Sequence, residues 1–386
     1  MNKVVLLIAL SVLAMSSALL ADEPASSQAE NARTFALVGG HIVGHGKATL
    51  IIRNGRIEQI ASATPNSTLR RVNADGRYIA PAFIDSHVHL AYRFSAPELA
   101  LGGIAAAVDL AAPVSFLANE LKPLRVILAG PMVTAITGYP TQSWGSDGYG
   151  LEISGAQAAR DAVDRLHAAG ARVIKIPVGD ATGGGALSMA KNPSILSDQE
   201  MAAIAGQAHS HGMRVVAHAL NDIDVLRAAA AGVDVLAHTP TEPLSSQTVK
   251  AWSGRAVIST LAAFPDLAEP AENIRRLRAG GATVLYGTDM GYTTFTGINP
   301  KEIELLGKAG LDGKAILAAG TTIPAQFWGF GDGVGTLAAG HTASLLILDA
   351  DPERNPLTLS RPLGVYLDGV QMGLKESKPR NEELTE

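Results

Sequence analysis

Residues 156–178, AQAARDAVDRLHAAGARVIKIPV, join a helical segment to a short apolar run through Gly170. The first part has the length and composition of a helix, whereas the second is rich in the β-branched residues that favour strands. The same order of helix, glycine and strand returns in residues 197–219, 221–239 and 272–289. Such an alternation predicts an α/β protein with a parallel sheet.

Four further apolar segments have the character of buried parallel strands, at residues 78–90, 103–112, 124–130 and 255–263. Together with the strands of the repeats they give eight strand candidates within residues 80–334. This number and rhythm predict a (β/α)8 TIM barrel. We expect the helices before four of the strands to end in left-handed glycines, namely Gly170, Gly212, Gly232 and Gly280.

The segments that flank the predicted barrel are rich in β patterns. Residues 33–79 contain Asn54-Gly55 between two alternating apolar runs, which predicts a hairpin. Residues 335–375 have a similar character. We expect these two segments to pair into one small β-sandwich beside the barrel.

The amino-terminal residues 1–21 combine one lysine, a short apolar stretch and small residues, a pattern typical of a secretory signal peptide. The apolar stretch is too short to span a membrane, so we expect a mature protein without a membrane anchor, located in the periplasm or secreted. Residues 22–32 are expected to form a linker.

The composition limits the chemistry of any site. The chain has no cysteine, so a metal must be held by nitrogen and oxygen ligands. A net charge of −5 over 386 residues gives no sign of nucleic-acid binding, and we expect a small-molecule substrate.

Histidine, lysine and aspartate side chains follow the predicted strands at their carboxyl ends. In a barrel, these ends form one face, where active sites lie. On a strand, positions i and i+2 point to the same side, so the two histidines of HVH can reach one ion. The predicted metal site comprises His87, His89, Lys175, His218, His238 and Asp289.

Lys175 stands among valine, isoleucine and proline in the segment RVIKIPV. Burying an unpaired charge is costly, so this lysine must be paired, neutral or chemically altered. A pairing with Asp180 or Asp289 is one alternative. The other is a carboxylated lysine, in which the amine adds carbon dioxide to form an anionic carbamate that bridges two cations.

As a set, these six residues resemble the amidohydrolase superfamily, in particular its binuclear members with a bridging lysine. The segments GGIAAAVDL, SDQEMAAIAGQAHSHGMRVVAHA and YGTD are similar to the imidazolonepropionase-like branch, which contains metal-dependent dipeptidases and prolidases. Leu90 and Ser344 depart from that branch, which often has glycine and aspartate at these positions. The resemblance spans nearly the whole predicted mature chain.

The resemblance implies two divalent metal ions, for which zinc is the expected element and manganese, cobalt or iron are alternatives. His87, His89 and Asp289 would bind one ion, His218 and His238 the other, and carboxylated Lys175 would bridge both. A metal-activated water would attack a carbonyl carbon. Asp289 would act as the general base and then as the general acid. A homo-oligomer is also implied by the resemblance.

We therefore expect a hydrolase that cleaves the amide or peptide C–N bond of a small molecule such as a dipeptide or an N-acyl amino acid. Lactone, phosphotriester or cyclic amide hydrolysis, a mononuclear deaminase and a non-catalytic metal-binding barrel remain alternatives. Side chains near the predicted site provide candidate substrate contacts: Tyr139, Trp144, Arg93 and Tyr292.

Overall fold

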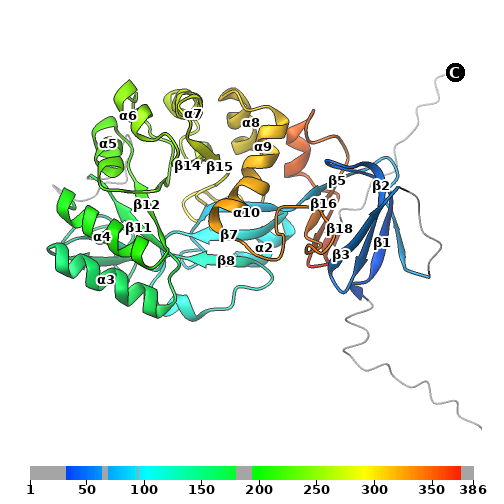
Figure 1. The fold of residues 1–386 in the computed structure, drawn as a ribbon, viewed down its shortest axis with the longest axis horizontal. Helices are drawn as coiled ribbons and strands as arrows, with labels where there is room; N and C mark the ends of the chain where they lie inside the picture. Colours follow the sequence, from blue (N-terminus) through cyan, green and yellow to red (C-terminus); the bar gives the residue numbers. More distant parts are fainter. Residues whose placement is uncertain (1–31, 63–67, 94, 180–193, 375–386) are drawn as a thin grey trace, which may run out of the picture.

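The computed structural model describes residues 32–62, 68–93, 95–179 and 194–374. The predicted signal peptide and most of the predicted linker lie outside these residues, as does Asp180. Figure 1 shows strands covered by helices in one part of the molecule and a separate β-rich part beside it. Among the described residues, no helix has the length and apolar character needed to cross a membrane.

Parallel strands make up two sheets in the larger part. One has the order β6-β7-β8, with β6 (Phe83–Val88), β7 (Ile104–Asp109) and β8 (Arg125–Leu128). The other has the order β11-β12-β13-β14-β15, with β11 (Val173–Pro177), β12 (Arg214–His218), β13 (Val235–Leu236), β14 (Ala256–Ile258) and β15 (Thr283–Leu285). These strands coincide with the eight predicted strand segments. An additional parallel pair, β9 (Met132–Ala135) and β10 (Gly150–Ile153), was not predicted.

Backbone hydrogen bonds connect the two parallel sheets at both of their edges. On one side, the Arg172 N–H donates to the Leu128 carbonyl at 3.0 Å. On the other side, Ser86 N–H donates to the Tyr286 carbonyl at 2.9 Å, and Asp289 N–H donates to the His87 carbonyl at 2.9 Å. The carboxyl end of β6 therefore lies directly beside the segment that follows β15.

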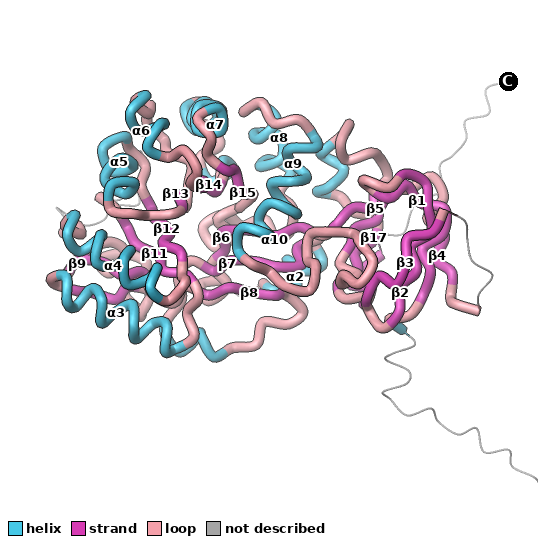
Figure 2. Tube along the Cα trace, in the orientation of Figure 1, coloured by secondary structure: helices cyan, strands magenta, loops and turns pink. Residues whose placement is uncertain are grey.

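Helices cover the outside of the parallel strands (Figure 2). They are α2 (Ala96–Leu101), α3 (Ala156–Ala169), α4 (Asp198–Ser210), α5 (Asp222–Ala230), α6 (Ser246–Ala251), α7 (Glu269–Ala279), α8 (Pro300–Lys308), α9 (Gly313–Gly320) and α10 (Thr322–Trp328). Three short 3-10 helices are η1 (Val114–Ala118), η2 (Leu261–Ala263) and η3 (Pro356–Ser360). Several helices bury alanines, such as Ala159 and Ala162 on α3 and Ala205 and Ala208 on α4, which allows close packing.

Glycines end most of the predicted helices as expected, with one difference. Gly170, Gly212 and Gly232 have positive φ angles of 111°, 68° and 91°. The prediction for Gly280 is wrong, because its φ is −77° and Gly281 takes the left-handed conformation with φ 93°. Two adjacent glycines offered either position, and the sequence alone could not tell them apart.

The β-rich part consists of one continuous eight-stranded sheet. Its order is β18-β17-β16-β5-β1-β2-β3, and β4 also pairs with β1. The strands are β1 (Phe35–Ile42), β2 (Gly46–Arg53), β3 (Arg56–Ala61), β4 (Arg71–Asn73), β5 (Tyr78–Pro81), β16 (Leu345–Leu348), β17 (Gly364–Leu367) and β18 (Val370–Leu374). The amino- and carboxyl-terminal segments thus lie side by side, as Figure 1 shows.

The join between these two segments is the antiparallel pair β5 and β16, in which Ala80 lies opposite Leu346. The sheet has its own buried apolar cluster, which includes Leu50, Ile79 and Leu345. The predicted hairpin at Asn54-Gly55 is confirmed, since β2 and β3 are antiparallel and both turn residues have positive φ. The division into domains at residues 33–79, 80–334 and 335–375 stays a prediction.

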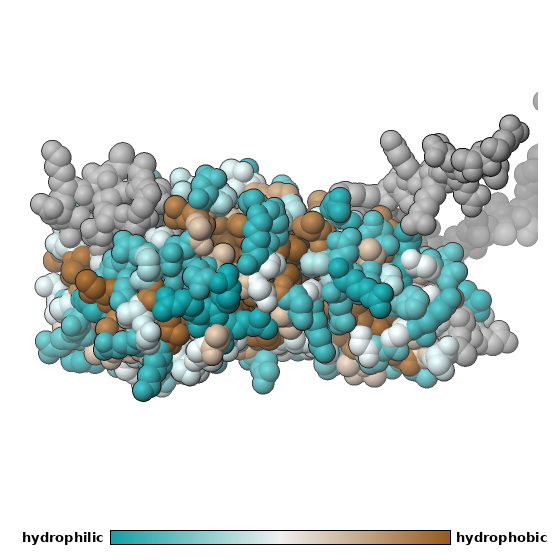
Figure 3. Space-filling model, turned by 90° about the horizontal axis from the view of Figure 1, so that it is seen from above, coloured by the Kyte–Doolittle hydropathy of each residue, from teal (hydrophilic) through white to brown (hydrophobic). Residues whose placement is uncertain are grey.

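The face seen from above is mostly hydrophilic, with apolar residues scattered among polar ones (Figure 3). The apolar side chains are concentrated inside, where a large cluster runs between the helices and the parallel strands. This distribution is typical of a folded domain whose core is shielded from water.

Glu302, in the first turn of α8, is a fully buried carboxyl group in this core. Its Oε2 accepts a hydrogen bond from the Ala262 N–H at 2.6 Å, and Oε1 has no partner among the described residues. Burial raises the pKa of Glu302 to about 7, although hydrogen bonds from Ser259 and from the backbone of η2 oppose the shift. The fold therefore favours the protonated carboxyl group.

This raised pKa predicts a loss of stability as the pH increases. The stabilisation is complete below the ordinary pKa of 4.5 and is lost as the pH rises through about 7. The variant Glu302→Gln stays neutral, so its free energy of unfolding should not fall in this way. Between pH 5 and pH 8, its free energy of unfolding relative to that of the wild type should rise by on the order of 2 kcal/mol. Urea unfolding at both pH values measures this difference.

The control is Glu304→Gln on the same helix, because the Glu304 side chain is 44% exposed and pairs with surface lysines. It should show little change with pH relative to the wild type. If the stability difference for Glu302→Gln were the same at both pH values, the raised pKa would be refuted.

Candidate metal centre

The two histidines of β6 and its extension enter the centre of the site from one strand face. His87 is fully buried and His89 is 7% exposed. The His87 Nδ1 lies 2.8 Å from the Ala237 carbonyl, which can only accept a hydrogen bond, so this nitrogen carries the proton. The His87 Nε2 is consequently the basic nitrogen, and it lies 3.2 Å from the His89 Nε2.

Asp289 faces both of these imidazoles from the segment after β15. Its Oδ1 is 3.0 Å from the His89 Nε2 and 3.3 Å from the His87 Nε2. Asp289 has a φ of 54°, in the left-handed region that non-glycine residues seldom adopt. Such strain persists only where the surroundings hold it, and it is often found at functional sites.

His238 completes a compact group of metal-ligand type. One ligand atom from each of His87, His238 and Asp289 lies within 4.8 Å of the others. The His238 Nδ1 is 3.1 Å from the Thr260 Oγ1 and 3.9 Å from the Asp289 Oδ2. All three groups are buried, so together they could hold a metal ion.

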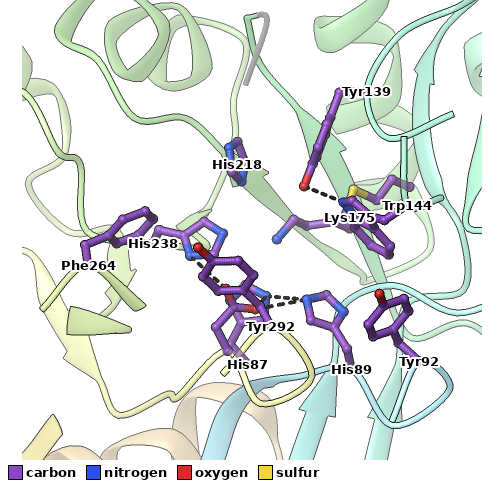
Figure 4. A pocket seen from close by; sticks show the side chains of 12 residues that line it. His87, His89, Tyr92, Tyr139, Trp144, Lys175, His218, His238, Phe264 and Tyr292 are labelled. Atoms are coloured by element: carbon purple, nitrogen blue, oxygen red, sulfur yellow. Dashed lines mark hydrogen bonds and ion pairs between the residues drawn. The ribbon is translucent and has the colours of Figure 1, made fainter. Parts of the chain in front are cut away.

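Lys175, in the middle of β11, and His218, at the end of β12, face the same space (Figure 4). Lys175 is 1% exposed and His218 is 6% exposed. Four buried atoms of this cluster have no hydrogen-bond partner among the described residues: His89 Nδ1, Lys175 Nζ, His218 Nε2 and Asp289 Oδ1. Unpartnered polar atoms are costly to bury, and their nitrogen and oxygen chemistry fits a divalent metal.

Burial also sets the charges of these groups. It lowers the pKa of Lys175 to about 7, although the carboxylate of Asp289 partly opposes the shift. Burial and the nearby Lys175 charge lower the pKa of His218 to about 3. Burial opposes ionisation of Asp289, but the imidazoles of His87 and His89 hold its pKa well below the usual range. The cluster thus favours a neutral imidazole at His218 and an anionic carboxylate at Asp289.

All six predicted metal-ligand residues line one cavity, and their role as metal ligands stays a prediction. The suggested pairing of Lys175 with Asp289 lacks a hydrogen bond, since the Lys175 Nζ has no partner among the described residues. Asp180 lies outside the described residues. The assignment of individual ligands to ions stays a prediction.

Asp85, which was not predicted from the sequence, supports the site through hydrogen bonds to its backbone and to Thr288. Its Oδ2 accepts a hydrogen bond from the Thr288 hydroxyl at 2.6 Å. Its Oδ1 accepts from the backbone N–H groups of His87 and Thr288, both at 3.1 Å. Asp85 therefore ties the HVH strand to the segment that carries Asp289. The pattern of residues 85, 87 and 89 on one strand face was a signal that could have identified it.

The cavity beside this cluster has a volume of about 140 Å³. Tyr139, Trp144 and Tyr292 line it, as predicted, but Arg93 does not. Arg93 follows a turn in which its N–H donates to the His89 carbonyl, and its side chain is exposed. Three further lining residues were not predicted, namely Tyr92, Met132 and Phe264.

Two of the lining residues hold each other in place. The Trp144 Nε1–H donates a hydrogen bond to the Tyr139 hydroxyl oxygen at 2.8 Å. The Tyr139 ring also packs against the His218 imidazole with 5.4 Å between the ring centres. The aromatic wall of the cavity thus packs directly against the cluster of imidazoles.

A family model described as "Amidohydrolase family" matches residues 78–372, which is most of the chain. The chain belongs to the amidohydrolase family. This membership establishes a metal-dependent hydrolase and agrees with the His87, His238 and Asp289 cluster, which could hold a metal. The matched range contains the whole site described above.

An adenine deaminase from Deinococcus deserti is 27% identical over 318 residues, which cover 78% of this chain and 53% of that protein. The chain thus spans about half the length of this curated relative. A putative prolidase from Bifidobacterium longum has a TM-score of 0.73 and 24% identity, covering 88% of this chain and 95% of that one. A Xaa-Pro dipeptidase with bound methionine also has a TM-score of 0.73, at 19% identity, covering 88% and 99%. The two structural likenesses establish a shared fold.

The position of Asp85 predicts an effect on metal affinity. In Asp85→Asn, one of the carboxylate acceptors becomes a donor, so the bonds to Thr288 and to the His87 backbone cannot all form. We expect the affinity for zinc to fall roughly 10- to 100-fold, as is usual when a supporting partner is lost. Competition with a chromophoric chelator measures it.

The control is Asp161→Asn, which changes the same chemical group at an exposed position of α3. Its zinc affinity should equal that of the wild type. Equal affinity in Asp85→Asn would show that Asp85 does not support the ligand geometry.

Proposed function

We propose that this protein hydrolyses the C–N bond of a small amide, with two divalent metal ions held by the buried cluster. One observation carries the proposal: an unpartnered lysine amine, Lys175, faces the same enclosed space as four imidazoles and a carboxylate. A single ion bound by histidine and aspartate would leave this amine without a function. A dipeptide or an N-acyl amino acid is the substrate type that the sequence resemblance suggests.

The ligand assignment follows the positions of the side chains. His87, His89 and Asp289 would hold one ion, because their facing atoms lie 3.0 to 3.3 Å apart. His218 and His238 would hold the second ion, and Lys175 would join the two sites as a carbamate. Carbamate formation joins the neutral amine to carbon dioxide and releases one proton. Zinc suits these nitrogen and oxygen donors.

Bound metal ions would supply a Lewis acid for the substrate carbonyl and lower the pKa of water. The residues of the chain then move the proton. The Asp289 carboxylate is held anionic at the centre of the cluster and would accept a proton from the attacking water. It would return this proton to the leaving nitrogen, so that the C–N bond breaks to give an acid and an amine.

We infer that the two parallel sheets belong to one (β/α)8 barrel. The hydrogen bonds at both edges, from Arg172 to Leu128 and from Asp289 to His87, support this inference. It accounts for the meeting of side chains from five strands and the segments after them at one cavity.

Deamination is a second candidate function, because the curated relative from Deinococcus deserti is named an adenine deaminase. It too breaks a C–N bond with water. The two candidates differ in the released product, which is ammonia for deamination and a substituted amine for amide hydrolysis. Measuring the number of metal ions per chain and identifying the released product distinguishes the two candidate functions.

The variant Lys175→Met tests the bridging role. Methionine has a similar length but no amine, so replacing the buried lysine should keep or raise the melting temperature of the metal-free protein. We expect about two metal ions per chain in the wild type and one or fewer in the variant, with hydrolysis lost. Elemental analysis and calorimetry provide both measurements.

A matched control is Lys308→Met, since Lys308 is 59% exposed on α8 and pairs with Glu304 at the surface. It should keep the metal content and the activity of the wild type. If Lys175→Met folded and kept two ions together with its activity, the bridging assignment would be wrong.

A further inference from the structure

The cavity beside the cluster concentrates the aromatic side chains of this chain. The sequence contains only 3 Trp, 7 Tyr and 8 Phe in 386 residues. Five of these aromatic residues nevertheless line this one cavity: Tyr92, Tyr139, Trp144, Phe264 and Tyr292. Aromatic walls of this kind favour flat or bulky apolar groups.

These rings surround the imidazoles from several sides (Figure 4). Trp144 packs edge-on to Tyr92 at 5.6 Å between ring centres and to His89 at 5.7 Å. Phe264 packs edge-on to His238 at 5.9 Å on the other side. Tyr292, which is 50% exposed, lies in front of the imidazoles at the mouth of the cavity. A substrate carbonyl that reaches the cluster must therefore bring its neighbouring groups between aromatic rings.

The charges of the side chains that line the cavity also restrict the substrate. Among the described residues, no arginine lines the cavity, and Lys175 is the one lysine that does. Lys175 is buried within the proposed metal site, so it is not free to bind a substrate carboxylate. A carboxylate placed between the aromatic rings would be desolvated without a cationic side chain as its partner, which is unfavourable.

The size of the cavity limits the apolar group. Its volume is about 140 Å³. A cavity of ~150 Å³ in another protein is known to accommodate benzene. Because the proposed metal ions would take part of this space, the apolar group should be no larger than about one six-membered ring.

We propose that this site selects uncharged amides that carry one aromatic ring, or an aliphatic group of similar size, and no free carboxylate. The inference rests on the proposed function and narrows it away from free dipeptides and N-acyl amino acids. Hydrolysis adds one water across the bond, so that the carbonyl carbon gains the oxygen and the nitrogen leaves as a protonated amine. The aromatic rings bind the apolar group, and the lack of a free cationic side chain among the described lining residues disfavours acidic substrates.

A matched pair of substrates tests this selection on the zinc-loaded protein. N-acetylphenethylamine and N-acetylphenylalanine have the same ring and the same amide, and they differ only in the carboxylate. We expect kcat/KM to be at least ~10-fold higher for the neutral compound, a difference that corresponds to about 1.4 kcal/mol. Equal values, or a preference for N-acetylphenylalanine, would overturn the inference.

Binding distinguishes a failure of this inference from a failure of the proposed function. If neither compound is hydrolysed, the amidase proposal fails, but the quenching of Trp144 fluorescence still reports which compound enters the cavity. The variant Trp144→Phe should lose this signal. Tighter binding of N-acetylphenethylamine supports the inference, and equal or weaker binding refutes it.

Two variants at one position test whether charge decides the selection. Tyr292→Arg adds a cation at the half-exposed mouth of the cavity, and Tyr292→Gln removes the same ring without adding charge. The arginine should shift the preference toward N-acetylphenylalanine by ~10-fold or more, whereas the glutamine should leave the neutral compound preferred. A shift of equal size in both variants would show that the missing cation does not determine selection.

Discussion

The cost of burying Lys175 among imidazoles is the constraint on which the rest of this site depends. The Lys175 amine is 1% exposed and has no hydrogen-bond partner among the described residues, so burial disfavours its charged form. The neighbouring groups reduce this cost, because Asp289 supplies the opposite charge and the histidines supply lone pairs. The Ala237 carbonyl and the Thr260 hydroxyl in turn hold the imidazoles of His87 and His238 through Nδ1, which leaves their Nε2 atoms for a ligand role.

Much of this arrangement could be predicted from the sequence because it follows a simple rule of position. Parallel strands place the residues at their carboxyl ends on one face, and His218, His238 and Lys175 each stand five or six residues after a helix-ending glycine. The Asn54-Gly55 hairpin is an equally local pattern, and the structure confirms it. Local patterns could therefore locate the strands and the cluster.

The parts that sequence analysis missed depend on contacts between distant segments. Phe264 lines the cavity only because the chain turns through η2 after β14, where Thr260 adopts a φ of 40° that its β-branched side chain disfavours. Arg93 was predicted to contact the substrate because it is close to His89 in the sequence, but the turn beside it leaves its side chain in solvent. The choice of Gly281 over Gly280 is a similar case, since packing decides between two chemically identical neighbours.

The pairing of β5 with β16 also has a consequence for biosynthesis. During translation, the amino-terminal strands emerge from the ribosome long before Leu346, which is the partner of Ala80 in the finished sheet. Until that residue is made, β5 presents an open hydrogen-bonding edge to other nascent chains. Completion of this sheet is therefore a late event, and the intervening α/β segment must already be compact enough to bring the two ends of the chain together.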